Sequence, residues 1–388
     1  MDLKEYFSNG YLLVVEDMTS MRRTIKAMLK QAGLSNVVEA DDGDTALRVV
    51  RTQENCLFIL LDWNMPRVPG LDVVREIRST AANQDIPLLM VTAEMGRAEV
   101  MQAAEAGVNG YIVKPFVSKT LEDKIKSVLA ARAAPPEHVK LLKAGEEFIL
   151  RGDYKKALAF FEKAKELRES ARVHVNIGEA HELAGNNALA HESYNTAIEL
   201  NPLFIKGYLR SAALYEKQGN LDAALAAFKK VVEISPNNPG RHFSIGNLHL
   251  KKGDLAKAQE SYLLAVKQEA ALASEIAEEL LKNGKDDMAE HFFRTSLVKA
   301  ANNVHVYNRL GIALRRQGKW QEAIKEYETA LKIDPRDAGI HFNIGKACVE
   351  GGVRARALEA FQKALDIDPS LTEARDELDA INKRPAWD

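Results

Sequence analysis

Seven glycines at nearly constant spacing constrain the fold of the C-terminal part of the chain more than any other feature. They are separated by 33, 34, 34, 31, 34 and 34 residues: Gly152, Gly185, Gly219, Gly253, Gly284, Gly318 and Gly352. An alanine follows each glycine by five residues, and an aromatic residue follows each alanine by four. A period of this length is typical of helix-turn-helix units that stack into a solenoid. The glycine suits the turn, and the alanine and aromatic residue suit close packing between helices.

The region before these repeats follows a different pattern, in which apolar runs of strand length alternate with amphipathic helical stretches. We expect strands at about 11–15, 36–39, 57–61, 87–91 and 110–113, and helices at about 19–32, 43–53, 70–80, 97–106 and 118–132. Five βα units of this size predict an α/β domain with a doubly wound five-stranded parallel sheet. The chain is therefore expected to be multidomain, with an all-α superhelical solenoid after the sheet.

The boundaries follow from the change of pattern. We predict an α/β domain over 1–133, a linker with two prolines over 134–137, seven repeats over 138–371, and a capping helix and tail over 372–388. The linker is short and stiff, so neighbouring domains should touch. The fifth repeat lacks three residues, has Ala273 in place of an aromatic residue and has no closing proline. A local bend and ordinary drift explain this departure equally well.

Composition narrows the classes of function. A formal net charge of −2 gives no basic footprint for nucleic acid. Two cysteines do not make a disulfide framework or a metal cluster. The N-terminus has no apolar leader, and no apolar run approaches the roughly 20 residues that span a bilayer. We therefore expect a cytoplasmic protein. Three histidines of the repeats occupy the repeat position that Tyr208 and Tyr307 hold in other repeats, which favours a packing role over metal binding: His174, His242 and His341.

Polar residues stand where four of the five predicted strands end. Glu16 and Asp17 follow the first strand, Asp62 the third, Thr92 the fourth and Lys114 the fifth. The carboxyl ends of parallel strands meet at one edge, where ligand sites of such sheets lie. Three carboxylates placed together repel one another unless a cation joins them, and a site with few protein carboxylates plus water suits Mg²⁺.

The same residues suit one type of chemistry. A carboxylate can accept a phosphoryl group as a nucleophile, with a metal and Lys114 neutralising the phosphoryl oxygens and Thr92 hydrogen-bonding one of them. No G-x-G-x-x-G follows the first strand, so a dinucleotide site is disfavoured.

Residues 11–132 resemble the receiver domain of response regulators, a flavodoxin-like fold, and are particularly similar to single-domain chemotaxis regulators. The motifs that carry the resemblance are Glu16-Asp17, Asp62-Trp63-Asn64-Met65-Pro66, Val91-Thr92-Ala93-Glu94 and Gly110-Tyr111-Ile112-Val113-Lys114-Pro115-Phe116. The later units resemble tetratricopeptide (TPR) repeats. Together they suggest a bacterial two-component response regulator whose TPR domain acts in signal transduction through protein-protein interaction.

This resemblance implies a role for each matched residue. Asp62 would be phosphorylated by a histidine kinase or phosphotransfer protein. Mg²⁺ would be held by Glu16 through water, by Asp17, by Asp62 and by the backbone carbonyl of Asn64. Thr92 and Tyr111 would form a switch, and Asn64 and Glu94 would tune dephosphorylation.

The resemblance also implies which activity and which partners to expect. The receiver would catalyse only its own phosphotransfer and autodephosphorylation, so the protein is not expected to be an enzyme in any other sense. Expected partners are the kinase and an unknown protein or peptide in the TPR groove, without nucleic acid or membrane insertion. The resemblance also allows a dimer through the receiver.

Three alternatives stay open. The first is a constitutive TPR scaffold with an idle receiver. The second is a phosphatase of small esters, which Asn64 disfavours because such enzymes place an aspartate there. The third is a clamp for C-terminal carboxylates in the repeats, because Asn176, Lys206 and Arg210 match part of one, although Leu142 and Glu146 do not.

Overall fold

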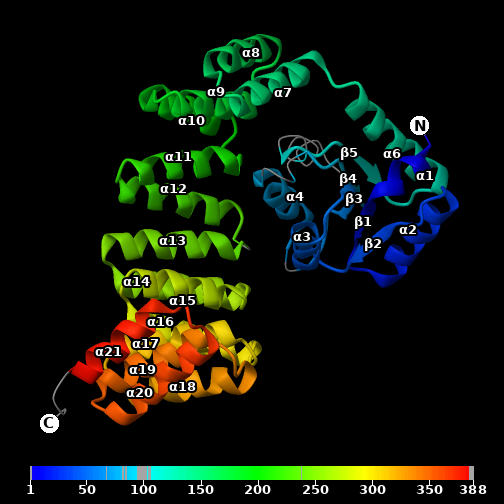
Figure 1. The fold of residues 1–388 in the computed structure, drawn as a ribbon. Helices are drawn as coiled ribbons and strands as arrows, with labels where there is room; N and C mark the ends of the chain where they lie inside the picture. The colour runs from blue at the N-terminus through cyan, green and yellow to red at the C-terminus, as the bar shows by residue number, and fades with distance from the viewer. Residues whose placement is uncertain are drawn as a thin grey trace. The chain divides into compact units, whose positions relative to one another are not determined.

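The computed structural model of the chain describes residues 2–66, 68–80, 83, 85–93, 103, 106–236 and 238–383. The chain divides into two compact units, Met1–Asn238 and Pro239–Asp388. The first unit contains an α/β domain and helices α7 to α12, and the second contains helices α13 to α21 (Figure 1).

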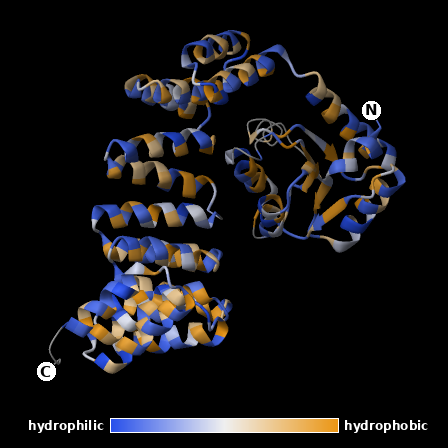
Figure 2. Ribbon diagram, viewed as in Figure 1, coloured by the Kyte–Doolittle hydropathy of each residue, from blue (hydrophilic) through white to orange (hydrophobic). Residues whose placement is uncertain are grey.

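The predicted sheet is confirmed as five parallel strands in the order β2-β1-β3-β4-β5. The strands are β1 Tyr11–Val15, β2 Val37–Ala40, β3 Cys56–Asp62, β4 Leu88–Thr92 and β5 Gly110–Val113. The central strands β1, β3 and β4 are buried or nearly so along their length, and Figure 2 shows the strands of this domain as mostly hydrophobic. Burial on both faces is the physical reason for such unbroken apolar runs.

Helices cover both faces of the sheet. They are α1 Leu3–Tyr6, α2 Thr19–Gln31, α3 Gly43–Thr52, α4 Gly70–Ser79 and α6 Ser118–Ala133, with a short 3₁₀ turn, η1, at Phe7–Asn9. Apolar residues of α1, α2 and α6 form one core with the sheet, and those of α3 and α4 form the other. The predictions missed α1 and η1, because four residues are too few for a helical period. The helix expected at 97–106 falls largely outside the described residues.

The repeat helices of the first unit form three antiparallel pairs. They are α7 Glu137–Leu150 with α8 Tyr154–Leu167, α9 Ala171–Leu183 with α10 Asn187–Leu200, and α11 Ile205–Lys217 with α12 Leu221–Ile234. Helix α6 ends at Ala133 and α7 begins at Glu137, with Pro136 as the residue just before it.

The second unit continues the same design. Its helices are α13 Pro239–Lys252, α14 Leu255–Gln268, α15 Leu272–Lys282, α16 Asp286–Lys299, α17 Val304–Arg316, α18 Trp320–Ile333, α19 Ala338–Glu350, α20 Arg354–Ile367 and α21 Thr372–Lys383. Helix α15 has 11 residues, two or three fewer than the other helices of the pairs, which accounts for the short fifth repeat. Among the described residues, no helix is both long enough and apolar enough to cross a bilayer.

The periodic residues pack as the spacing predicts. All seven turn glycines have positive φ, between 68° and 82°, a conformation that costs little only for glycine. Five other glycines, in the first helices of their pairs, lie against an aromatic ring, so that an added Cβ would come within 2.5 Å of it: Gly145, Gly178, Gly246, Gly311 and Gly345. Glycine at these places lets the ring of the following helix fill the space between the two helices.

Candidate functional site

Four strands bring the predicted polar residues to one edge of the sheet. Strand β1 ends just before Glu16 and Asp17, β3 ends on Asp62, β4 ends on Thr92, and β5 ends just before Lys114. The parallel registers pair Val15 with Leu61 and Asp62 with Val91, so these ends are direct neighbours. Residues that are far apart in the sequence thus meet because their strands run in the same direction.

The three carboxylates form a compact group. Ligand oxygens of Glu16, Asp17 and Asp62 all lie within 4.8 Å of one another. The ammonium of Lys114 lies 2.8 Å from Oε2 of Glu16 and 3.1 Å from Oδ1 of Asp62. Side chains of Glu16 and Asp62 are only 1% and 7% exposed, so water screens these charges poorly.

The electrostatics show that one lysine does not satisfy this cluster. Burial raises the pKa of Glu16, and its hydrogen bond to Lys114 offsets this only in part. Burial likewise raises the pKa of Asp62, against the opposing charge of Lys114. Burial disfavours the charge of Lys114 as well, but the hydrogen bond and the charges of the two carboxylates outweigh it and raise the lysine's pKa. The cluster therefore has excess negative charge.

The donor set fits a hard divalent cation. Oxygen Oε1 of Glu16 is buried and has no hydrogen-bond partner in the described part of the chain. A buried carboxylate oxygen without a partner is costly unless a ligand or water satisfies it. Carboxylate oxygens are ligands that Mg²⁺ prefers, and no other group of three or more potential metal ligands occurs among the described residues.

The structure places the remaining predicted residues as follows. Thr92 is 1% exposed at the end of β4. Tyr111 on β5 is 38% exposed, with the ammonium of Lys124 5.6 Å from its ring centroid. Asn64 follows β3 by two residues and is exposed, and the role of its carbonyl stays a prediction. Glu94 lies outside the described residues.

Two residues that support the site were not predicted. Arg22 on α2 donates a hydrogen bond of 2.6 Å to the carbonyl oxygen of Glu16 and forms an ion pair of 3.3 Å with Glu39. Gly70 begins α4 so close to β3 that an added Cβ would lie 2.1 Å from the carbonyl oxygen of Asp62. An arginine in the first turns of the helix after the acidic pair was a visible signal. The need for glycine at position 70 appears only in three dimensions.

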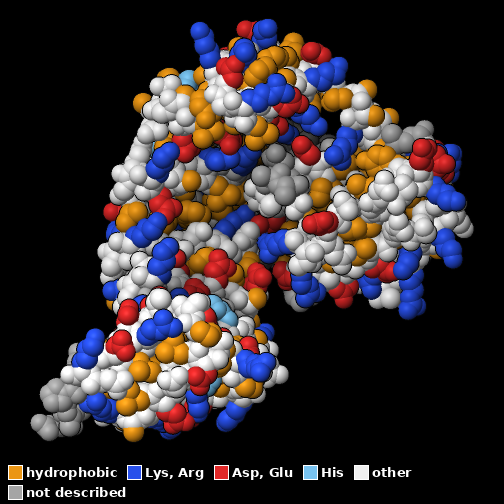
Figure 3. All heavy atoms as spheres, viewed as in Figure 1, with side chains coloured by type: hydrophobic (Ala, Val, Ile, Leu, Met, Phe, Trp, Pro, Cys, Tyr) orange, Lys and Arg blue, Asp and Glu red, His pale blue; other side chains and the backbone are white. Residues whose placement is uncertain are grey.

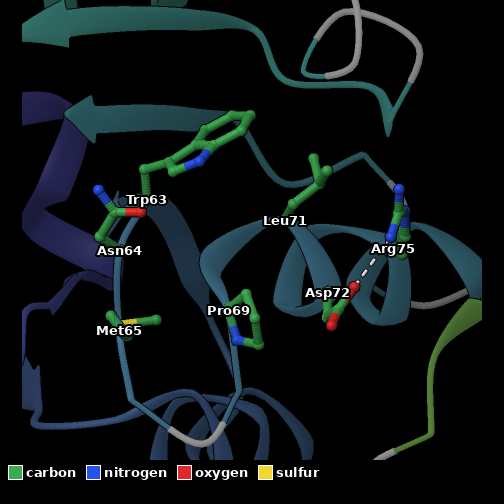
Figure 4. A pocket seen from close by; sticks show the side chains of 7 residues that line it. All are labelled: Trp63, Asn64, Met65, Pro69, Leu71, Asp72 and Arg75. Atoms are coloured by element: carbon green, nitrogen blue, oxygen red, sulfur yellow. Dashed lines mark hydrogen bonds and ion pairs between the residues drawn. The ribbon is translucent and has the colours of Figure 1, made fainter. Parts of the chain in front are cut away.

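A cavity of about 580 Å³ opens beside the acidic cluster, between the loop after β3 and helix α4. It is lined by Trp63, Asn64, Met65, Pro69, Leu71, Asp72 and Arg75. Figure 4 shows the indole of Trp63 and the side chain of Asn64 on one side of this space, and the ion pair of Arg75 with Asp72, 2.9 Å long, on the other. Trp63 directly follows Asp62, so its ring is a natural reporter of changes there.

Comparisons with known proteins agree with this geometry. The family model described as the response regulator receiver domain matches residues 12–126. The chemotaxis protein CheY of Pseudomonas aeruginosa is 45% identical over 117 residues, which are 30% of this chain and 94% of that protein. The chain belongs to the response-regulator family.

Further similarities of this response regulator lie in both regions. Chemotaxis protein CheY-3 of Vibrio cholerae is 43% identical over 120 residues, 31% of this chain and 92% of that protein. The solved structure of Vibrio cholerae CheY4 is 30% identical and covers 31% of this chain and 98% of its own, with a TM-score of 0.29. TPR repeat models match residues 171–202, 214–253, 241–272, 311–352 and 338–371. The response regulator therefore joins a receiver to TPR repeats.

Asn176 and Arg210, two residues of the partial clamp match, have partners within the repeats of this response regulator. Glu146 accepts a hydrogen bond of 2.9 Å from Nδ2 of Asn176, and Glu179 forms an ion pair of 2.6 Å with Arg210. Two of the three matching side chains are thus bound to carboxylates of the chain itself. A negative charge at position 146 also repels a ligand carboxylate. These contacts favour the interpretation of the match as packing.

Proposed function

We propose that this protein is a two-component response regulator that is phosphorylated on Asp62 by a histidine kinase or phosphotransfer protein in a Mg²⁺-dependent reaction, and that it acts through protein binding by its TPR repeats. One observation carries the proposal: Glu16, Asp17, Asp62 and Lys114 converge at the sheet edge, and Oε1 of Glu16 has no hydrogen-bond partner among the described residues. A structural ion-pair cluster would have enough cations to satisfy its own carboxylates.

Phosphoryl transfer needs a nucleophile, positive charge around the phosphoryl oxygens and an open approach. An Asp62 carboxylate oxygen attacks the phosphorus of a phosphohistidine; the O–P bond forms as the P–N bond breaks, and the imidazole leaves. Lys114, 3.1 Å from Asp62, binds one phosphoryl oxygen. Thr92, at the end of the neighbouring strand, donates a hydrogen bond to another. The cavity beside Trp63 and Asn64 gives the donor side chain its approach.

The metal would be held by Asp17, Asp62 and the carbonyl of Asn64, with Glu16 acting through water. When bound, Mg²⁺ supplies the positive charge that the cluster lacks and orients the phosphoryl oxygens. Arg22 fixes the backbone that carries Glu16 through its 2.6 Å hydrogen bond. Asn64 and Glu94 are the residues we propose to tune the later attack of water on the acyl phosphate. The protein has no other catalytic activity in this proposal.

The output we propose is a change in protein binding. Thr92 moves towards the phosphoryl group, and Tyr111, now 38% exposed, turns inward. In the second unit, a cavity of about 570 Å³ offers Phe243 and Leu281 beside the charged groups of Glu278, Arg309 and Arg316, a mixture that suits a peptide segment. On the face shown in Figure 3, acidic and basic side chains are interspersed, which supports a protein partner over nucleic acid. A cytoplasmic location completes the proposal.

Fluorescence of Trp63 tests the chemistry. In the full chain with Trp320→Phe and Trp387→Phe, Mg²⁺ followed by a small phosphodonor should change the emission, and Asp62→Ala should abolish the response. Asp72→Asn is the matched control, because it alters charge in the same cavity without touching the acidic cluster. Intact-protein mass spectrometry should show one added phosphoryl group in the control and none in Asp62→Ala. An unchanged mass in the control would leave the constitutive scaffold as the better function.

A further inference from the structure

A buried glutamate joins the receiver to the repeats within the first unit. Glu76 lies on helix α4 of the receiver and is 2% exposed. Its Oε1 accepts a hydrogen bond of 2.6 Å from Oγ of Ser235, and its Oε2 accepts one from Nδ2 of Asn238. Both donors lie just after α12, 159 and 162 residues further along the chain. A surface helix of the receiver thus delivers a carboxylate to the third pair of repeat helices.

A second polar contact lies beside the first helix pairs. Arg172, the second residue of α9, donates from Nη1 to Oδ1 of Asp85 in the receiver at 3.3 Å, and from Nη2 to Oε1 of Glu146 on α7 at 3.1 Å. The guanidinium is thereby shared by two carboxylates, one from the receiver and one from the repeats. Although burial opposes its charge, these carboxylates raise the pKa of Arg172.

Apolar residues add to the same interface. Arg75, Arg78 and Ser79 of the receiver line a small cavity together with Leu203, Phe204, Ile205 and Lys206 at the start of α11. Its volume is about 20 Å³, so little space is left between the two surfaces. Polar and apolar contacts from the third helix pair thus converge on the C-terminal half of α4, and Arg172 adds a contact from α9 to Asp85, which lies between α4 and β4.

The burial of Glu76 makes sense only with the repeats attached. Its neighbours Val73, Val74 and Ile77 pack into the core of the receiver, whereas Glu76 is bonded to repeat residues. Removing an ionised carboxylate from water is unfavourable unless hydrogen bonds or opposite charges replace the water. Ser235 and Asn238 supply such bonds, which makes the contact specific for an acidic side chain at this place.

We propose that the receiver is an intramolecular ligand of the repeats, docked through α4 with Glu76 as its anchor. The surface formed by Arg172, Lys206, Ser235 and Asn238 is then occupied by the chain itself. An outside protein that uses this surface must displace α4 and bring a carboxylate of its own to the same donors. These contacts support the docking whether or not Asp62 accepts a phosphoryl group.

One extension rests on the proposed function. Helix α4 begins at Gly70, whose backbone N–H donates a 3.1 Å hydrogen bond to the carbonyl of Trp63 and whose Cα lies against the carbonyl of Asp62. At the other end of this ten-residue helix, Arg75, Arg78 and Ser79 line a cavity together with repeat residues 203–206. A displacement of the Asp62 loop on phosphorylation would therefore reach the repeats through α4 rather than through the linker.

Hydrogen exchange of the full chain, without any phosphodonor, tests the docking. Glu76→Arg should speed exchange at least tenfold in residues 203–210 and 230–236, because the charge reversal opposes docking, and should leave α17 to α20 unchanged. Glu54→Arg is the matched control, since Glu54 is an exposed carboxylate of the same domain, and it should change neither region. If the repeats of the Glu76→Arg variant exchange at the wild-type rate while β1 and β3 stay protected, the proposal is wrong.

A substitution on the repeat side of the contact distinguishes loss of docking from unfolding of the receiver. Ser235→Glu places a second carboxylate against Glu76 and should speed exchange in α4 while β1 and β3 stay protected. If exchange in α4 stays at its wild-type rate, the docking is wrong, whatever Glu76→Arg does. Adding a beryllium fluoride complex with Mg²⁺ then tests the extension separately: it should change exchange in 203–210 in the wild type and leave it unchanged in Asp62→Asn.

Discussion

Glu16 in the receiver and Glu290 on α16 in the second unit are both carboxylates with little exposure to water. Their surroundings differ. Glu16 has Lys114 as an ion-pair partner, two neighbouring aspartates and one oxygen that no described residue bonds. Glu290 accepts hydrogen bonds from Arg294 at 3.1 Å and from Lys319 at 2.8 Å. A third, 3.2 Å long, comes from Gln317.

The pKa shifts of the two groups are opposite in direction. Burial raises the pKa of Glu16, and one lysine does not reverse this. Burial also acts to raise the pKa of Glu290, but the bonds from Lys319, Arg294 and Gln317 outweigh it and lower the pKa below its ordinary value. A carboxylate that serves the fold is satisfied by the chain, whereas one left unsatisfied is available to a ligand.

The largest effect should come from removing the lysine of the receiver cluster. Lys114→Met leaves buried Glu16 and Asp62 without their cation and should lower the receiver's unfolding free energy by about 3 kcal/mol without divalent ions. Urea unfolding followed by Trp63 fluorescence, with Trp320→Phe and Trp387→Phe, measures it. The matched control is Lys319→Met, followed by Trp320 with Trp63→Phe and Trp387→Phe. Equal losses of unfolding free energy in Lys114→Met and Lys319→Met would mean that the two carboxylate sites do not differ in this way.

The next effect should come from Mg²⁺. At about ten times its dissociation constant, the ion should raise the receiver's unfolding free energy by about 1.4 kcal/mol through binding to the folded state alone. Asp17→Asn should weaken this effect, because it removes a proposed ligand. The transition reported by Trp320 should stay in place, and a shift there as large as that of Trp63 would point to a general salt effect.

A smaller effect should come from neutralising the acceptor. Asp62→Asn should raise the receiver's unfolding free energy by about 1 kcal/mol without Mg²⁺, because it relieves repulsion. Since the folded pKa values of Glu16 and Asp62 lie above their unfolded values, the wild type should lose stability as pH rises through those folded values. Unfolding measured across the acidic range should show a shallower loss in Asp62→Asn. If the unfolding free energy of Asp62→Asn fell with pH as steeply as that of the wild type, this account would be contradicted.

The smallest effect should come from Glu290→Gln. This substitution should lower the unfolding free energy of the second unit by about 0.5 kcal/mol at neutral pH, because the ion-pair partners of Glu290 are partly exposed. The pH dependence should have the opposite sign. A folded pKa below the unfolded one gives stability that is present above the unfolded pKa and lost as pH falls through the folded value. Unfolding followed by Trp320 at neutral and acidic pH checks this. A variant stabilised at neutral pH would mean that Glu290 is as unsatisfied as Glu16.

Much of the fold follows from local patterns in the sequence. The glycine period predicts the helix pairs because each unit repeats the same contacts with its neighbours. The apolar runs predict the strands, and the parallel order of strands explains why Asp62 and Lys114, 52 residues apart, meet at one edge. The departure at Ala273 correctly marks the shortened helix α15.

Tertiary structure alone decided what surrounds these elements. Gly70 is needed because its backbone lies against Asp62, and Arg22 supports the site because α2 packs beside β1. Glu76 reads in the sequence as an ordinary surface carboxylate of α4, yet Ser235 bonds it from 159 residues away. The periodicity of apolar residues in the sequence indicates only which face of a helix or strand is apolar. The partner of a buried polar group depends on how separate elements pack, and no local pattern contains that information.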